Sequence, residues 1–242
     1  MTASTPRVRF ADAGEAADVA AFLARLIHYD KAAVVRLQAG GGALAVFGRP
    51  ASFEVLAVRS ARLAEGSGVS GGPGAPGGSG ELDVTVSAGE LLEGVDEGAA
   101  AVAVPSAVTG PPWAGVLPPK GGWERVPGLP SSVGVLRAVR AAVSEFRGRV
   151  EELDPAKRTR GELDRIGREV WSRPVGDTEL PVRAAHAARV LGFLPSAESA
   201  GFRSGELSLW AAGAWLRLRT PYGAVVVRVV GGGAGLGVMP QV

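Results

Sequence analysis

The segment Trp215–Arg228, WLRLRTPYGAVVVR, decides the fold of the C-terminal part of the chain. Leucines alternate with arginines before the four residues TPYG (220–223), and a run of valines follows them. Proline presets φ at the second position of such a turn and glycine relieves its fourth position, so the segment predicts an antiparallel hairpin. A turn centred on Pro221-Tyr222 pairs Trp215 with Arg228.

This register gives the hairpin two different faces. The apolar face, which we expect to be buried, carries Leu216, Leu218, Val225 and Val227. The other face carries Arg217, Arg219 and Arg228, and a slip of one residue would exchange the two faces. Trp215 and Arg228 are placed on that outer face to form a cation–π pair, worth about 0.5–1 kcal/mol when exposed.

Three helices are predicted before the hairpin. An apolar stripe at steps of three and four runs from Val133 to Leu153, and Asp154-Pro155 ends it. The capping box at Thr159–Glu162 opens a second helix, and a third is predicted over Glu179–Phe193. With a further strand at Leu207–Ala211, residues 131–230 predict a three-helix unit followed by a β-hairpin.

The N-terminal part predicts an antiparallel sheet with flanking helices, so the fold class is α+β. Asp12 is placed to cap a first helix, and Ser87 a short second one, with Glu90 three residues on. Glycines 40–42 predict a hairpin turn, and the strand that follows it has apolar residues on both faces, which places it centrally. The predicted elements are a helix at Ala16–Ile27 and strands at Ala32–Gln38, Ala43–Phe47, Phe53–Leu63 and Leu82–Ser87.

Composition shifts divide the chain into four parts. Residues 1–104 form the sheet domain, and residues 66–80 within it are a Gly/Pro-rich insert expected to be flexible. Residues 105–130 are a Pro/Gly-rich connector, whose two indoles, Trp113 and Trp123, are expected to pin it to a neighbouring domain. Residues 131–230 hold the helices and hairpin, and residues 231–242 are a tail.

Composition also excludes several kinds of chemistry. The chain has no cysteine, which removes disulfides and thiolate metal sites, and only two histidines, His28 and His186. Its first residues lack an apolar signal segment, and no stretch approaches the ~18 apolar residues of a membrane span. We therefore expect a cytoplasmic protein that is not an enzyme, with no cofactor, no metal and no membrane partner.

Charge is unevenly distributed. Residues 66–130 carry two basic and seven acidic side chains, whereas residues 131–242 are net basic. The order helix, helix, turn, helix, hairpin resembles a winged helix-turn-helix, which implies duplex DNA as a partner. The candidate nucleic-acid-binding residues are Arg183, His186 and Arg189 on the third helix and Arg217, Arg219 and Arg228 on the hairpin. The alternative is three helices packed on a hairpin, with ordinary arginines on the surface. Pro181 within the supposed recognition helix favours this alternative.

Two family resemblances extend over further parts of the chain. The segments HYDKAAVVRLQ (28–38), PPWAGVLPP (111–119) and LRLRTPYGAVVVR (216–228) resemble uncharacterised proteins of high-GC actinobacteria, which implies no known activity. A strand at Arg7–Phe10, a helix, a three-strand meander and LDVTVSAGELLEGV (82–95) resemble half a domain of a sliding DNA clamp, a resemblance of topology that carries no functional residue.

The leading functional hypothesis is a non-enzymatic binding or regulatory module that acts through protein–protein contacts. The alternative is a winged-helix DNA-binding regulator, and the second alternative is a hydrolase without a recognisable motif. The partner and the oligomeric state are left open by the sequence.

Overall fold

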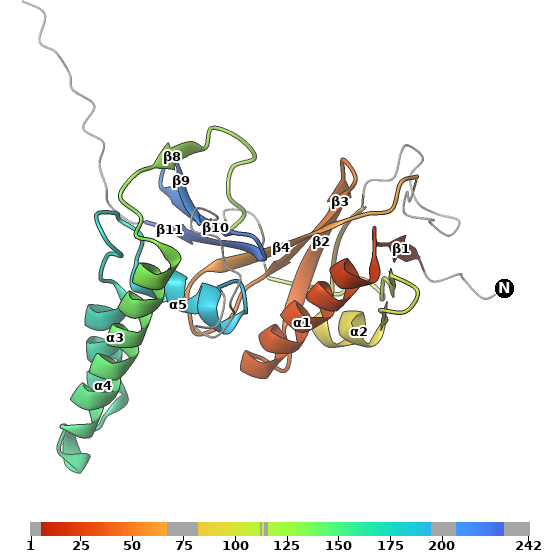
Figure 1. Ribbon diagram of the computed structural model, residues 1–242. Coiled ribbons are helices and arrows are strands. Elements are labelled where there is room, and N and C mark those ends of the chain that lie inside the picture. Colours follow the sequence, from red (N-terminus) through yellow and green to blue (C-terminus); the bar gives the residue numbers. More distant parts are fainter. Residues whose placement is uncertain (1–5, 67–81, 112, 114–115, 195–206, 230–242) are drawn as a thin grey trace, which may run out of the picture.

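The computed structural model describes residues 6–66, 82–111, 113, 116–194 and 207–229. One eight-stranded antiparallel sheet runs through the molecule in the order β5-β2-β3-β4-β11-β10-β9-β8 (Figure 1). The helices lie on one face of this sheet, below it in Figure 1. The fold class is therefore α+β, as predicted. The Gly/Pro-rich insert at 66–80, apart from Gly66, and the tail at 231–242 lie outside the described residues.

The N-terminal half supplies four strands and two helices of this arrangement. Asp12 caps α1 by accepting from the backbone N–H of Glu15 at 2.9 Å, and Ser87 caps α2 by accepting from Glu90 at 3.4 Å, as predicted. The β2–β3 turn requires its glycines, because Gly41 and Gly42 have φ of +59° and +77°. The elements are α1 (Ala13–Tyr29), α2 (Ala88–Glu93), β2 (Val34–Gly40), β3 (Ala43–Gly48), β4 (Leu56–Arg62) and β5 (Leu82–Ser87), with a small separate sheet of β1 (Arg7–Arg9), β7 (Ala101–Ala103) and β6 (Val95–Asp96).

The C-terminal half supplies the other four strands and three helices. The helices are α3 (Ser132–Glu151), α4 (Arg160–Trp171) and α5 (Val182–Val190), with a short 3-10 turn at Pro155–Lys157. The strands are β8 (Glu124–Val126), β9 (Ser208–Ala212), β10 (Trp215–Thr220) and β11 (Gly223–Arg228). Strand β8 lies in the predicted connector and pairs with β9, and its three residues are too short to show a period of their own.

The predicted hairpin is confirmed in register and in faces. Trp215 pairs with Arg228 and Arg219 with Ala224. The four residues of the apolar face are at most 6% exposed: Leu216, Leu218, Val225 and Val227. The guanidinium of Arg228 lies 5.9 Å from the ring centroid of Trp215, which is the expected cation–π contact.

The two halves are joined inside the sheet rather than only through the connector. Strand β11 pairs with β4, matching Ala224 with Val58 and Val226 with Leu56. The sequence predicts the sheet and the hairpin in separate parts of the chain, whereas the structure makes them one sheet. The apolar residues on both faces of β4 predict a central strand, and its second neighbour is β11.

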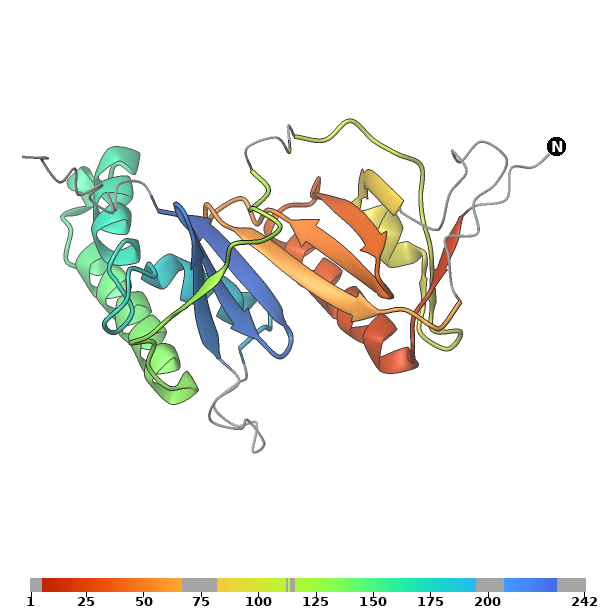
Figure 2. The ribbon, with the colours of Figure 1, turned by 90° about the horizontal axis from the view of Figure 1, so that it is seen from above.

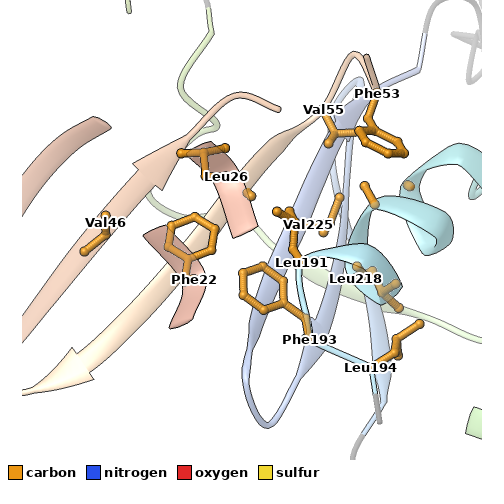
Figure 3. Close-up of a cluster of buried hydrophobic side chains, with 14 of the residues drawn as sticks. Phe22, Leu26, Val46, Phe53, Val55, Leu191, Phe193, Leu194, Leu218 and Val225 are labelled. Atoms are coloured by element: carbon orange, nitrogen blue, oxygen red, sulfur yellow. The ribbon is translucent and has the colours of Figure 1, made fainter. Parts of the chain in front are cut away.

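Side chains from both halves cover the joint on its helical face (Figure 3). Phe22 of α1 stacks on Phe193, which follows α5, with ring centroids 5.4 Å apart. Gly223 at the start of β11 has φ of +155°, and a Cβ there would lie 2.7 Å from the Phe193 ring. The close approach of the ring to the strand therefore requires a glycine at this position.

A second, smaller cluster covers the other face of the joint. Leu56 and Val226 pack with Trp113, whose indole N–H donates to Thr85 Oγ1 at 3.0 Å. Trp123 packs against the same cluster and donates to the carbonyl of Pro119. The chain between β7 and β8 passes from one half to the other on this side (Figure 2). Both indoles thus pin the connector to the sheet, as predicted.

The third C-terminal helix and the strand predicted from Phe53 both begin three residues later than predicted, for local reasons. The third helix, predicted over Glu179–Phe193, begins at Val182, because Pro181 occupies its N-cap position, and ends where Gly192 adopts φ of +77°. The strand predicted from Phe53 begins at Leu56, because Glu54 has φ of +51°, outside the extended region.

Candidate functional site

The six residues predicted to contact nucleic acid do not form one surface. Arg217 and Arg228 lie on the face of the sheet that the connector covers, where the Arg217 guanidinium stacks 3.9 Å from the Trp123 ring centroid. Helix α5, with Arg183, His186 and Arg189, packs against β11 on the opposite face, and Arg219 lies in β10 beside Arg217 and is exposed. The structure therefore divides the predicted set between two faces.

The winged-helix arrangement also differs from the one expected. Strand β10 has neighbours on both sides, β9 and β11, and β11 has β4 as its second neighbour, so the hairpin is no free wing. The supposed recognition helix buries most of its surface through its alanines, which are 0% exposed: Ala184, Ala185, Ala187 and Ala188. The order of elements alone could not show this burial, because it depends on where the sheet lies.

Around α5 the structure instead forms a cleft at the meeting of the two halves. One wall is residues 51–54, between β3 and β4, and the other is built from α3, α4 and α5. The cleft has a volume of about 730 Å³, within the range of roughly 300–1,000 Å³ that is usual for ligand sites. Of the predicted residues, it contains Arg183 and His186.

Aromatic rings form the floor of this cleft. The imidazole of His186 stacks on the indole of Trp171, with centroids 4.9 Å apart and planes 15° apart. Phe53 meets His186 edge-on at 5.4 Å, and Phe146 packs against Trp171 at 5.6 Å. Phe53, Phe146 and Trp171 are absent from the predicted set, since periodicity assigns Phe146 to the core stripe and Phe53 to one face of a predicted strand, and gives Trp171 no role.

Charged groups lie among these rings. The Nε of Arg183 is buried and has no hydrogen-bond partner, and it lies 3.9 Å from Oε2 of Glu54. Glu54 holds a left-handed φ of +51°, which costs a residue with a side chain of order 1 kcal/mol or more. Arg160, Arg168 and Asp164 line the side formed by α4, and their side chains are exposed. The cleft therefore combines buried and half-buried rings with arginines of which two, Arg160 and Arg183, have only long ion pairs of 3.8 and 3.9 Å with Asp164 and Glu54.

Burial determines the charge of His186. The apolar surroundings lower the pKa of His186 below its ordinary 6.5, and the nearby positive charge of Arg189 lowers it further. The imidazole is therefore neutral at pH 7, which allows it to stack on Trp171 without the cost of burying a charge.

This shift predicts a pH dependence of stability. The unfolded chain takes up a proton on His186 at a higher pH than the folded chain, so the free energy of unfolding falls as the pH drops through 6.5 and levels off below the folded pKa. Urea unfolding between pH 7.5 and 5 should show this loss, and His186→Phe, which keeps an aromatic ring, should reduce it. His28→Asn removes the other histidine and should leave the loss in place. Equal slopes in the wild type and His186→Phe would contradict the assignment.

A second hollow, of about 500 Å³, lies on the other side of the 49–55 segment, between Trp113, Trp215 and Arg49. Among the described residues no group of three or more His, Asp or Glu side chains is placed to hold a metal ion. Within the same part of the chain, no helix combines the length and apolar character needed to cross a bilayer.

The fold and the cleft define a two-part α+β protein built on one shared sheet, with a candidate binding site where the parts meet. Residues 3–115 match the family model of a domain of unknown function (DUF8010), and residues 118–232 match that of a second domain of unknown function (DUF8185). The two matched regions follow one another along the chain, and neither description names an activity. None of the curated proteins matches it.

Proposed function

We propose that this protein is a non-enzymatic binding module that recognises a segment of another protein in the cleft between residues 51–54 and α4–α5. The observation that carries the proposal is the stack of His186 on Trp171, beside Phe53 and the partly unpaired Arg183, in an open cleft. Tryptophan and arginine are the residues that most often dominate the energy of protein–protein interfaces.

The form of the cleft supports the same conclusion. Ligand sites concentrate where two parts of a protein meet. In this cleft one wall comes from the N-terminal half and the other from the C-terminal half. The left-handed Glu54 lies on the shorter wall, and backbone strain of this kind gathers at binding sites. Three arginines face two carboxylates in the lining, so the expected partner segment carries an acidic residue beside an apolar or aromatic one.

A photocrosslinker placed in the cleft tests the proposal. Leu163, on α4, lines the cleft and is only partly buried, so p-benzoylphenylalanine at this position should capture the partner in cells of the native host. The control is the same crosslinker at Val133, which is 64% exposed on α3 and outside the cleft. We expect a protein adduct from position 163 that is absent from position 133, identified by mass spectrometry.

The purified partner then permits a quantitative test. Trp171→Ala should weaken its binding by roughly 30-fold, the effect of a hot-spot residue worth about 2 kcal/mol. Arg168→Glu, at an exposed position that can change without unfolding α4, should also weaken it. Unchanged binding in both variants, or a nucleic-acid adduct at position 163, would contradict the proposal, and the latter would favour the DNA-binding alternative.

A further inference from the structure

A second charged surface lies on α3, beside the end of α5. Residues at steps of three and four place Arg140, Ser144, Arg147 and Glu151 on one face of this helix. Arg189, from the end of α5, lies beside them, and together they surround a hollow of about 530 Å³. The hollow shares no lining residue with the cleft described above.

The arginines of this hollow differ from their neighbours in pairing. Within the described ranges, Arg140, Arg147 and Arg189 form no ion pair and no side-chain hydrogen bond, and all three are exposed. Three other arginines of this region are neutralised by glutamates: Arg149 of α3 by Glu169, Arg165 of α4 by Glu162, and Arg173, which follows α4, by Glu145. The lining of the hollow therefore carries three unneutralised arginines and a single carboxylate, that of Glu151.

The floor of the hollow contains a glycine that packing does not require. Gly148 lies near the C-terminal end of α3, and a Cβ added there would meet no atom within 4 Å. Glycine destabilises a helix relative to alanine. Gly148 therefore reduces the stability of α3, although no neighbouring atom is close enough to require a glycine there. Its effect on the surface is to keep the hollow open between the arginines.

We propose that this hollow binds a small phosphorylated ligand, whose phosphate lies between the guanidinium groups of Arg140, Arg147 and Arg189. Guanidinium groups match phosphate oxygens with paired hydrogen bonds, and the hydroxyl of Ser144 adds one more donor. The Glu151 carboxylate at one end repels a phosphodiester backbone that would continue past the hollow, and it accepts hydrogen bonds from hydroxyl groups. These features favour a compact phosphate ester over nucleic acid.

Titration of the full chain with inorganic pyrophosphate at constant ionic strength, followed by calorimetry, tests the site. We expect saturable binding that weakens at least tenfold in Arg140→Ala and in Arg147→Ala. Gly148→Leu keeps every charge and improves helix propensity, and it should abolish binding by filling the hollow. Arg219→Ala removes an exposed arginine from β10 and should change the affinity less than twofold.

Three results would overturn the proposal: no saturable binding of pyrophosphate, full affinity in Gly148→Leu, or an equal loss in Arg219→Ala. The proposal would also be overturned if a 12-base-pair duplex bound more tightly than pyrophosphate and Arg147→Ala weakened that binding. The hollow would then be part of a nucleic-acid surface. Far-UV circular dichroism and the melting temperature of each variant establish that it is folded.

Discussion

Replacing Phe193 with alanine will lower the free energy of unfolding by about 3–5 kcal/mol, the usual cost of removing a buried phenylalanine from a core. Phe193 is 2% exposed and stacks on Phe22 of α1 while its ring lies against Gly223 of β11. Its removal leaves a cavity between α1 and β11, where the two halves meet. Urea unfolding followed by circular dichroism measures the loss.

Tyr222→Ala provides the control for this prediction. Tyr222 lies next to Gly223 in the sequence but is 44% exposed, so truncating it should change the free energy of unfolding by less than about 1 kcal/mol. If Phe193→Ala cost no more than Tyr222→Ala, the two halves would not be held by this contact.

Arg59→Met should cost about 3 kcal/mol, because it breaks a largely buried ion pair. Arg59 of β4 is 6% exposed and reaches two carboxylates of α1, Asp18 at 2.6 Å and Glu15 at 3.6 Å. It also donates to the carbonyl oxygen of Tyr222 at 2.5 Å, so one side chain links a strand and a helix of the first half to the hairpin turn of the second. Methionine fills much of the space but leaves that carbonyl without its donor. We place the cost at the lower end of the usual range because Asp18 is half exposed and regains water, and Glu15 keeps Arg62 as a partner at 2.8 Å.

Arg62→Met is the matched control, since Arg62 lies further along β4 and pairs with Glu15, also of α1. The Arg62 side chain is 73% exposed, and its partner Glu15, which is 13% exposed, keeps Arg59 as a second partner at 3.6 Å, so we expect a loss of roughly 0–1 kcal/mol. The difference between the two variants in chemical denaturation measures the effect of burial on otherwise similar arginines. Equal losses would show that the contact with the hairpin turn contributes nothing.

Local features of the fold were predictable from the sequence, and features that depend on distant segments were not. The hairpin register followed from the four-residue turn and from the alternation of apolar and charged residues beside it. The caps at Asp12 and Ser87 were predictable because each side chain bonds a backbone N–H only three residues away. The pairing of Leu56 with Val226 joins residues far apart in the chain. No pattern within either segment specifies that partner.

The same limit applies to the candidate site. Helical spacing places Arg183, His186 and Arg189 on one arc of α5, and that arc predicts an exposed surface. Two of these side chains are instead partly buried, because α3, α4 and residues 51–54 close around the helix. The stack of His186 on Trp171 requires the packing of α4 against α5, which spacing along either helix cannot show.

The pairing of β4 with β11 has a consequence for synthesis on the ribosome. Val58 and its partner Ala224 are separated by most of the chain, and at translation rates of about 5–20 residues per second β11 emerges roughly 10–30 s after β4. During that interval β4 has an unpaired edge at Leu56, Ala57 and Val58, all apolar, and such edges pair readily with other chains. Crowded polysomes therefore bring many nascent copies of this edge close together before any copy can cover its own.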